Sequence, residues 1–403
     1  MNAVGIDVSK GKSTVAVLRP FGEIVVSPFD VFHNPKELGE LVTLLKSLDG
    51  ETKVVMEYTG NYYLPIAQVL HNEGIFVSVV NAIIVHDYGS KSIRKVKTDK
   101  KDALKLASFA LDRWLDLSAF TPEEDIRTLL KSYSRQYNHY NKVKIMLKNN
   151  LLALLDQSFP NVNSLFSSPA RKEDGHEKWI DFVLKYPHAD CISKKSLAAF
   201  SKSYLSWCRK HGYNFSKLKA KEVYDFACNC TPSLPLSESS ALLVSNAIFQ
   251  LNYIMETLAK LATEMNRLAS SLPEYNVVMS MFGVGSVLGV QLIAEIGDVS
   301  RFRSKRSLVA FAGLDSPPDE SGKFSAASRP ISKRGSSQLR KTLFQVMDVI
   351  LKNAPVNNPV FLFLDKKRAE GKYYLVYMQA AANKFLRIYY ARVTEHLNSL
   401  QVA

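Results

Sequence analysis

The sequence predicts an α/β domain at the N-terminus, followed by a chain that is mainly helical. Short β-rich runs alternate with helical patterns at the start, and two later stretches keep apolar residues at steps of three and four. At 403 residues the chain is too long for one typical hydrophobic core. We therefore expect two or three domains.

Residues 1–115 carry the alternating pattern. Three β-rich runs joined by tight turns come first, which predicts an antiparallel meander. A helix follows from the Asn34-Pro35 start signal, then a strand, a helix that ends at Gly74, another strand and a further helix. The expected strands are 3–9, 12–18, 22–28, 52–58 and 75–81. This order, β-β-β-α-β-α-β and then a helix, is that of a ribonuclease H-like domain.

Residues 120–272 are expected to hold two long helices that flank a helical insertion at about 160–240. The first helix covers 125–156, and the second keeps its apolar spacing over more than three heptads. This spacing argues for a coiled coil, within the chain or between chains. Amphipathic helices packed on a bundle core are the alternative. The apolar positions of the second helix are Val244, Ala247, Leu251, Ile254, Leu258, Leu261, Met265 and Leu268.

The insertion contains all four cysteines of the chain, Cys191, Cys208, Cys228 and Cys230. With His211 they can be imagined as a zinc site. However, a C-x-C pair beside widely spaced single cysteines is not a zinc-finger spacing. We expect reduced structural thiols and assign the insertion no role.

Residues 274–403 are expected to form a mainly helical C-terminal domain. Near its start, Gly283 and Gly285 separate two apolar helical stretches, as in a helix-hairpin-helix motif. Glycines at such a junction let backbone amides approach a phosphate closely. Many ordinary helix junctions also contain a Gly-x-Gly, so this motif is unspecific by itself.

The charge balance points to a polyanionic partner. The chain has 52 Lys and Arg against 38 Asp and Glu, a net charge of +14 and a pI near 9.4, which favour nucleic acid. Residues 301–341 alone hold ten basic and three acidic residues, although a solvated basic face would show the same composition. The sequence contains no run of 18 apolar residues and no signal peptide, so we expect a cytosolic, nucleoid-associated protein without membrane contact.

Four acidic residues are candidates for a metal site. Asp7 lies in the first expected strand among apolar neighbours, where a carboxylate is costly to bury without compensation. Glu57 ends the fourth strand, which neighbours the first in a ribonuclease H-like sheet. Asp99 and Asp102 share one face of a helix or its first turn.

Converging carboxylates repel one another unless they bind divalent cations. We expect Mg²⁺ or Mn²⁺, which prefer oxygen ligands and can be shared with phosphate oxygens. The lysines around Asp99 would then contact the nucleic-acid backbone; they are Lys97, Lys100 and Lys101. Taken singly, each acid can also be a turn aspartate, a helix cap or a surface charge.

Several sequence blocks occur together in one known order. They include GIDVSK, MEYTGNYY, KTDKKDA, FGVGSVLGVQLIAEIGD, RFRSKRSLVAFAGLDSPPDESG and ISKRGSSQLRKTLF. In these blocks the chain resembles the DEDD transposases of the IS110 insertion-sequence family, which are bridge-RNA-guided recombinases. The resemblance covers about 1–155 and 240–385. The segment 160–240 is longer than is usual for that family, and nothing is carried over to it.

The resemblance implies that the N-terminal domain is resolvase-like, and it implies site residues in both halves of the chain. The family's Asp, Glu, Asp, Asp set matches Asp7, Glu57, Asp99 and Asp102, and its nucleophilic serine matches Ser321. Lys323, Arg329, Lys333 and Arg334 would neutralise charge on the reacting phosphate. The residues alone do not single out Ser321, because no histidine base lies near it in the sequence and other serines compete. These serines are Ser316, Ser325, Ser328, Ser332, Ser336 and Ser337.

By the same resemblance, the reaction is DNA strand exchange through a covalent phosphoserine, in a dimer to tetramer. A structured RNA would pair with target and donor DNA, so base pairing would read the sequence. Three alternatives stay open. They are a metal-only Holliday-junction endonuclease, a site-specific DNA invertase of the same family, and a non-catalytic nucleic-acid-binding protein.

Overall fold

The computed structural model describes residues 1–89, 98–168, 175, 177–316, 320–321, 324–325 and 330–402. It divides into two compact units, Met1–Glu123 and Glu124–Ala403, which are described one at a time. The expected three-part division at 115–120 and 272–274 stays a prediction.

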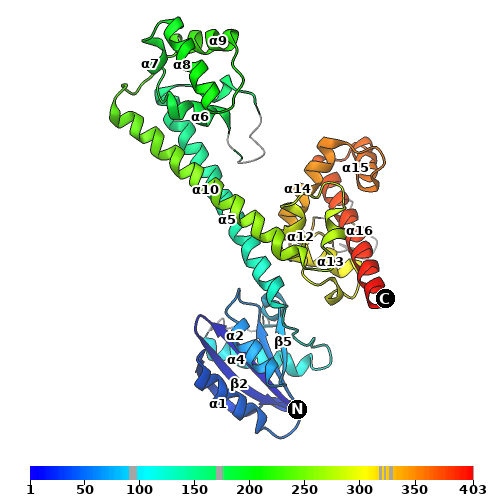
Figure 1. Ribbon diagram of the computed structural model, residues 1–403. Helices are drawn as coiled ribbons and strands as arrows, with labels where there is room; N and C mark the ends of the chain where they lie inside the picture. The colour runs from blue at the N-terminus through cyan, green and yellow to red at the C-terminus, as the bar shows by residue number, and fades with distance from the viewer. Residues whose placement is uncertain are drawn as a thin grey trace. The chain divides into compact units, whose positions relative to one another are not determined.

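The first unit is built on a five-stranded sheet with the strand order β3-β2-β1-β4-β5 (Figure 1). The strands are β1 (Asn2–Ser9), β2 (Lys12–Arg19), β3 (Glu23–Phe32), β4 (Thr52–Glu57) and β5 (Phe76–Val80). β1 pairs antiparallel with β2 and parallel with β4, and β5 runs parallel to β4. The predicted meander and the predicted contact of the first and fourth strands are both confirmed.

Helices cover both faces of this sheet. α1 (Pro35–Lys46) and α2 (Leu64–Asn72) pack on the face that carries Val4, Ile6, Val54 and Met56. Helix α4 (Asp99–Asp112) packs on the opposite face, where Leu106 joins a small core with residues of β1 and β4. Helix α3 (Ala82–Gly89) follows β5 and lies against α4. The mixed α/β prediction for this domain is therefore confirmed.

The second unit begins with a pair of long helices. α5 (Asp125–Ser158) and α10 (Glu238–Ser270) run side by side, which confirms the two long helices that the apolar spacing predicted (Figure 1). Toward one end of the pair, Leu251 is buried with Leu151 and Leu155. Toward the other end, Leu130 and Met265 join the core of the C-terminal helices. The apolar stripe of α10 is thus largely covered within this chain.

The segment between the long helices is helical, as predicted. It contains α6 (Lys178–Lys185), α7 (Asp190–Ser193), α8 (Leu197–Lys210) and α9 (Lys217–Cys228). Its core is aromatic, with Phe182 packed edge-on against Trp207. All four cysteines are free thiols. Within the described ranges no group of three His, Cys, Asp or Glu side chains is arranged to hold a metal ion.

The C-terminal helices share one core, in which α12 is buried along nearly its whole length. They are α11 (Tyr275–Met279), α12 (Leu288–Ile296), α13 (Lys305–Phe311), α14 (Ser337–Asn353), α15 (Pro359–Ala369) and α16 (Tyr374–Val402). A two-stranded hairpin of β6 (Glu320–Ser321) and β7 (Phe324–Ser325) lies between α13 and α14 in the sequence. Short 3₁₀ turns are η1 (Pro20–Gly22), η2 (Val162–Leu165) and η3 (Val299–Arg301). No helix among the described residues is long and apolar enough to cross a membrane.

A single glycine tests the packing of α4 on β1. A Cβ on Gly5 would overlap the backbone carbonyl oxygen of Ala103, so we expect Gly5→Ala to lower the free energy of unfolding by about 1–3 kcal/mol or more. Gly39→Ala is the matched control, because Gly39 lies in α1 with open space around it. That control should raise stability by about 0.5–1 kcal/mol. Urea unfolding measures both, and equal effects of the two changes would contradict the close packing.

Candidate functional site

Asp7 and Glu57 lie on the same face of the sheet, at the carboxyl ends of neighbouring parallel strands. Ile6 of β1 pairs with Met56 of β4, so Asp7 and Glu57 are the next residues in the same register. Successive side chains of a strand point to opposite faces. Because Ile6 and Met56 belong to the core under α1 and α2, the two acids point to the α4 face. Both side chains are half-buried.

Helix α4 brings the second pair of acids to that face. Its chain passes so close to β1 that Gly5 and Ala103 meet without an intervening side chain. Asp102 directly precedes Ala103 and is half-buried, whereas Asp99 is exposed one turn earlier. Asp102 therefore lies over the strand that carries Asp7.

The first turn of α4 has a local reason to be acidic. The Thr98 side chain caps the helix by accepting a hydrogen bond from the backbone N–H of Lys101 at 3.3 Å. Asp99 and Asp102 then stand where the positive end of the helix dipole favours negative charge. Helix formation thus stabilises these carboxylates before any ligand is considered.

Charges of the β2–β3 edge lie near this turn. Lys12 donates to Asp30 at 2.9 Å; this hydrogen bond and the charge of Asp30 raise the pKa of Lys12, and the charge of Asp99 adds to the effect. The hydrogen bonds from Lys12 and Thr14 lower the pKa of the Asp30 carboxyl, with a further contribution from Lys100. The start of α4 therefore faces β2 and β3. Lys100 and Lys101 are exposed there, and Lys97 lies outside the described residues.

The donor set suits a hard divalent cation in chemical type. Carboxylate oxygens are the ligands that Mg²⁺ and Mn²⁺ prefer, and Asp7, Glu57 and Asp102 supply them from three elements on one face. Asp7 and Glu57 also interact with other groups of the protein. In the described part of the chain the acids do not form a group of three positioned to hold one ion. Asp7, Glu57 and Asp102 would be the residues that hold such an ion, and a change in their side-chain positions would have to accompany its binding.

The second candidate region is the segment around Ser321. Ser321 belongs to β6 and pairs through its backbone with Phe324 of β7, while its side chain lies outside the described part. Lys323 and Arg329 also lie outside it. Lys333 and Arg334 are exposed at the foot of this segment.

The two ends of this segment, at Asp315 and Ser332, form its foot and are held together by hydrogen bonds and close backbone packing. The backbone N–H of Ser332 donates to the carbonyl of Asp315 at 2.8 Å, and the Ser332 hydroxyl donates to the Asp315 carboxylate. A Cβ on Gly335 would overlap the carbonyl oxygen of Phe311, so the two chain passages touch directly. Arg340 donates to the carbonyl of Ala312 at 2.9 Å. The chain therefore leaves and re-enters the helical core at one fixed point.

The sequence reasoning missed a buried carboxylate behind this foot. Glu295 of α12 is only 2% exposed, and it accepts hydrogen bonds from the Ser336 hydroxyl at 3.1 Å and from Arg135 of α5 at 3.5 Å. Ser336 also caps α14. Glu295 thus joins α5, α12 and the start of α14. Its signal in the sequence is an acid at the end of the apolar run that forms α12.

The two glycines of the expected helix-hairpin-helix motif have different surroundings. A Cβ on Gly283 would lie 2.7 Å from a side-chain carbon of Ile350, and its φ is +83°, so packing against α14 already explains this glycine. Gly285 is exposed and faces open space. Its role in phosphate binding stays a prediction.

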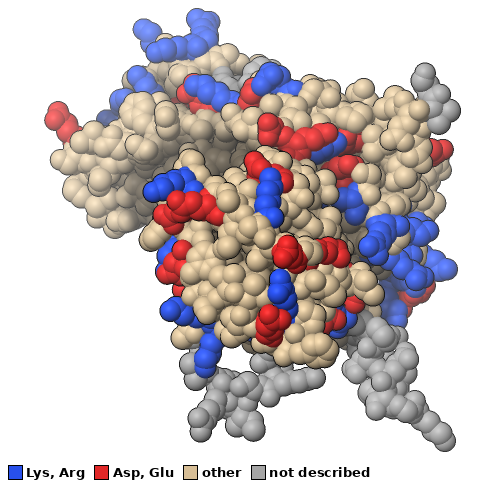
Figure 2. Space-filling view, turned by 90° about the horizontal axis from the view of Figure 1, so that it is seen from below, with Lys and Arg blue, Asp and Glu red and all other residues tan. Residues whose placement is uncertain are grey.

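Basic and acidic side chains are mixed on one face of the protein. On the face shown in Figure 2, Lys and Arg side chains lie interspersed with Asp and Glu. On this face, attraction of a polyanion would depend on local groups of basic residues, because opposite charges that alternate over a surface largely cancel at a distance.

Two family models match this chain. A model described as a transposase, of the DEDD IS110 type, matches residues 4–160, and the Transposase IS116/IS110/IS902 family model matches 275–359. The chain belongs to the IS110 family of transposases. The first match contains all four candidate acids and the second contains Ser321, whereas 161–274 lies between the matches.

Relatives of this IS110-family chain are similar over most of their length. A 44.8 kDa protein of insertion element IS116 from Streptomyces clavuligerus is 22% identical over 369 residues, covering 91% of this chain and 88% of the relative. A pilin gene-inverting protein of Moraxella bovis is 23% identical, with coverage of 85% and 80%. A 43.6 kDa protein of insertion element IS110 from Streptomyces coelicolor is 19% identical, with coverage of 97% and 94%.

Metal binding by the acids can be measured without any DNA reaction. If Asp7 helps to hold Mn²⁺, saturating Mn²⁺ should stabilise the wild-type transposase by about 1–3 kcal/mol, because a ligand that binds only the folded state raises its stability. Asp7→Asn should lose most of this shift in thermal unfolding. Asp116→Asn is the control, since Asp116 is an exposed carboxylate of the same unit outside the acid group. An Asp7→Asn protein with the full Mn²⁺ shift would remove Asp7 from the site.

Proposed function

We propose that this IS110-family transposase exchanges DNA strands with two chemical parts, an acidic metal site on a ribonuclease H-like domain and the hydroxyl of Ser321. The observation that supports the proposal most is the placement of Asp7 and Glu57 side by side under α4, whose first turn contributes Asp99 and Asp102. Acids from three separate elements on one face have no evident purpose in packing.

The carboxylates would orient the reacting phosphate through the bound cation. When bound, Mg²⁺ or Mn²⁺ supplies positive charge that stabilises the negative charge building up on phosphate oxygens. Asp7 and Glu57 sit on strands of the sheet interior, so their backbone is rigid. Asp99 and Asp102 stand at a helix start, where a small rotation of the side chains changes their reach.

The serine step conserves the energy of the phosphodiester. The Ser321 oxygen forms a bond to phosphorus, the bond from phosphorus to one DNA oxygen breaks, and that strand leaves with a hydroxyl end. The serine proton passes to solvent, and a solvent proton completes the hydroxyl of the strand that leaves. Attack of a second strand's hydroxyl on the phosphoserine reverses these changes and joins the strands without ATP.

Basic residues would hold the DNA backbone and spread the charge of the transition state. Lys333 and Arg334 are exposed at the foot of the Ser321 segment, and Lys323 and Arg329 are its sequence neighbours. Lys100 and Lys101 would hold backbone phosphates beside the acids, together with Lys97. Exposed lysines and arginines of this kind position nucleic acid without reading its sequence.

The partners follow from the same proposal. A structured bridge RNA would select target and donor DNA by base pairing, and the acid group of one subunit would work with the serine of another in a dimer to tetramer. The protein would act in the cytosol. The long helices α5 and α10 pack within the chain, so contact between subunits would use other surfaces of these helices.

A site-specific DNA invertase is the second candidate. It is favoured by the similarity to the pilin gene-inverting protein of Moraxella bovis over 85% of this chain. Inversion and transposition would use the same residues and differ in the arrangement of the DNA sites. A metal-only junction endonuclease would use the four acids and would not need Ser321.

The serine proposal predicts a covalent adduct. Reactions stalled on nicked DNA should yield a protein–DNA complex that survives denaturant, and peptide mapping should locate the bond at Ser321. Ser321→Ala should lose the adduct and at least about 10³-fold of strand-exchange rate while still binding DNA, because one hydroxyl adds little to an interface of many phosphates. Ser316→Ala and Ser325→Ala are the controls and should stay active. Normal strand exchange by Ser321→Ala would favour the metal-only endonuclease.

The proposed binding of backbone phosphates predicts a defined salt dependence. Replacing both Lys100 and Lys101 by Glu should weaken nucleic-acid binding and reduce the slope of log affinity against log salt by about 0.9 for each phosphate that the protein no longer neutralises. Lys36→Glu with Lys46→Glu is the control, since both lysines are exposed on α1, which covers the opposite face of the sheet. A fluorescence titration at several salt concentrations measures both. Identical slopes for the two double variants would exclude phosphate binding at Lys100 and Lys101.

A further inference from the structure

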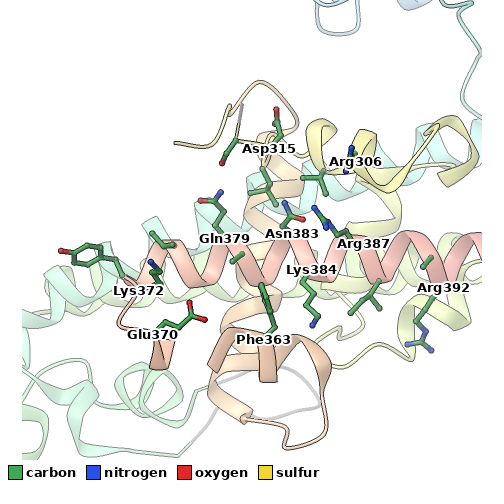
Figure 3. A pocket seen from close by; sticks show the side chains of 18 of the residues that line it. Arg306, Asp315, Phe363, Glu370, Lys372, Gln379, Asn383, Lys384, Arg387 and Arg392 are labelled. Carbon is green, nitrogen blue, oxygen red and sulfur yellow. The ribbon is translucent and has the colours of Figure 1, made fainter. Parts of the chain in front are cut away.

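A basic groove runs along α16 in the C-terminal part of the second unit. Its volume is about 1300 Å³, and it is bounded by α13, by α16 and by the turn between α15 and α16. Figure 3 shows Gln379, Asn383 and Arg387 in a row along α16, with Arg306 on one side and Phe363 on the other. None of these residues was singled out by the sequence motifs.

Positive charge dominates the lining. Five basic side chains line the groove against the two acids Asp315 and Glu370, and both acids have other partners. Asp315 accepts the hydroxyl of Ser332, and Glu370 accepts the ammonium of Lys367 at 2.7 Å. The five basic side chains are Arg306, Lys372, Lys384, Arg387 and Arg392.

Two of the three arginines of the groove, Arg306 and Arg387, are available for a ligand. In the described part of the chain, neither Arg306 nor Arg387 forms an ion pair with a carboxylate, and both are exposed. Arginine binds phosphate oxygens through paired N–H donors. The groove therefore offers a polyanion two exposed guanidinium groups, those of Arg306 and Arg387.

The floor of the groove combines amides with apolar surface. Gln379, Asn383 and Arg387 follow one another at steps of four along α16, a row of about 12 Å at 1.5 Å per residue. Asn and Gln amides donate to and accept from base edges. Val309 and Phe363 add apolar surface, and Tyr373 at the turn is 86% exposed.

These features fit an unpaired strand better than a duplex. Base faces are covered by stacking inside a duplex, whereas an unpaired strand offers them to aromatic and apolar side chains while its phosphates meet basic residues. The groove also reaches Asp315 and Ser316, the last residues before the segment that carries Ser321. A strand in the groove would therefore lie beside the start of the segment that carries the proposed nucleophile.

We propose that the α16 groove binds one unpaired DNA strand, with Arg387 on its backbone and Tyr373 stacked on a base. That the strand is DNA and not RNA rests on the proposed function of Ser321. The strand nearest the nucleophile would be the DNA strand that is cut and joined. The groove supplies what a strand-exchange enzyme needs after cleavage, which is a place for a single strand that has left its duplex.

Fluorescence anisotropy with a labelled oligo-dT tests the proposal on the full chain. Tyr373→Ala should weaken oligo-dT binding at least about fivefold, the lower limit for losing one stacked base. Arg387→Ala should also weaken it, and should reduce the slope of log affinity against log salt by about 0.7, the value for one phosphate contact to a single strand. Tyr373→Phe should bind like the wild type, because it keeps the ring. Arg368→Ala is the matched control, as Arg368 is an exposed arginine of α15 that does not line the groove. Thermal unfolding of each variant excludes loss of the fold.

Competition experiments show which kind of nucleic acid the groove binds. An unlabelled duplex of the same length should compete poorly, and an RNA oligonucleotide should show a smaller dependence on Arg387 and Tyr373 than oligo-dT. Unchanged oligo-dT affinity in both alanine variants, or a loss confined to duplex or RNA binding, would overturn the proposal. The Ser321→Ala adduct assay is independent of this readout. A failure of the serine mechanism therefore remains distinguishable from a failure of the groove.

Discussion

The arrangement of the acidic site depends on the close contact of α4 with β1. Gly5 has no side chain, and the backbone of α4 at Ala103 occupies the space that a Cβ would need. This contact fixes the first turn of α4 over the strand that carries Asp7. It also buries Leu106 and Phe109 against the sheet, so the energy of an ordinary apolar core holds an acidic helix start in place. The burial of Leu106 and Phe109, a few residues after the acids of α4, therefore opposes the electrostatic repulsion among the acids.

The segment that carries Ser321 depends on a comparable contact in the second unit. Gly335 and Phe311 touch through their backbones, and Asp315 and Ser332 are joined by two hydrogen bonds. Behind them, buried Glu295 links Ser336 to α5. The segment that carries the proposed nucleophile is thus anchored where Asp315 and Ser332 are bonded. The groove along α16 begins at the same place, because Asp315 also lines the groove. A DNA strand in the groove and the Ser321 segment would therefore both adjoin the Asp315–Ser332 contact.

The long helices are fastened to the C-terminal core by polar groups as well as apolar ones. Arg127 of α5 forms a buried ion pair with Glu274, the residue before α11, and Lys341 of α14 donates to Asn138 of α5 at 2.8 Å. Burial lowers the pKa of the Lys341 ammonium, with a further contribution from the charge of Lys142. A shift of α5 along its axis would leave Glu274 and Asn138 without these partners.

The sequence by itself determined the strands, the long helices and the helical insertion, whereas the expected closeness of Asp7 and Glu57 came from the ribonuclease H-like order of the strands. These elements follow from local patterns, since alternation assigns a strand residue to a face and a three–four spacing assigns a helix residue to a side. Tertiary structure decided the rest. Glu274 and Arg127 are 147 residues apart, Gly283 proved to face Ile350, and the α16 groove collects side chains from three elements. No local pattern contains such contacts, because they depend on which helix faces meet when separate segments pack together.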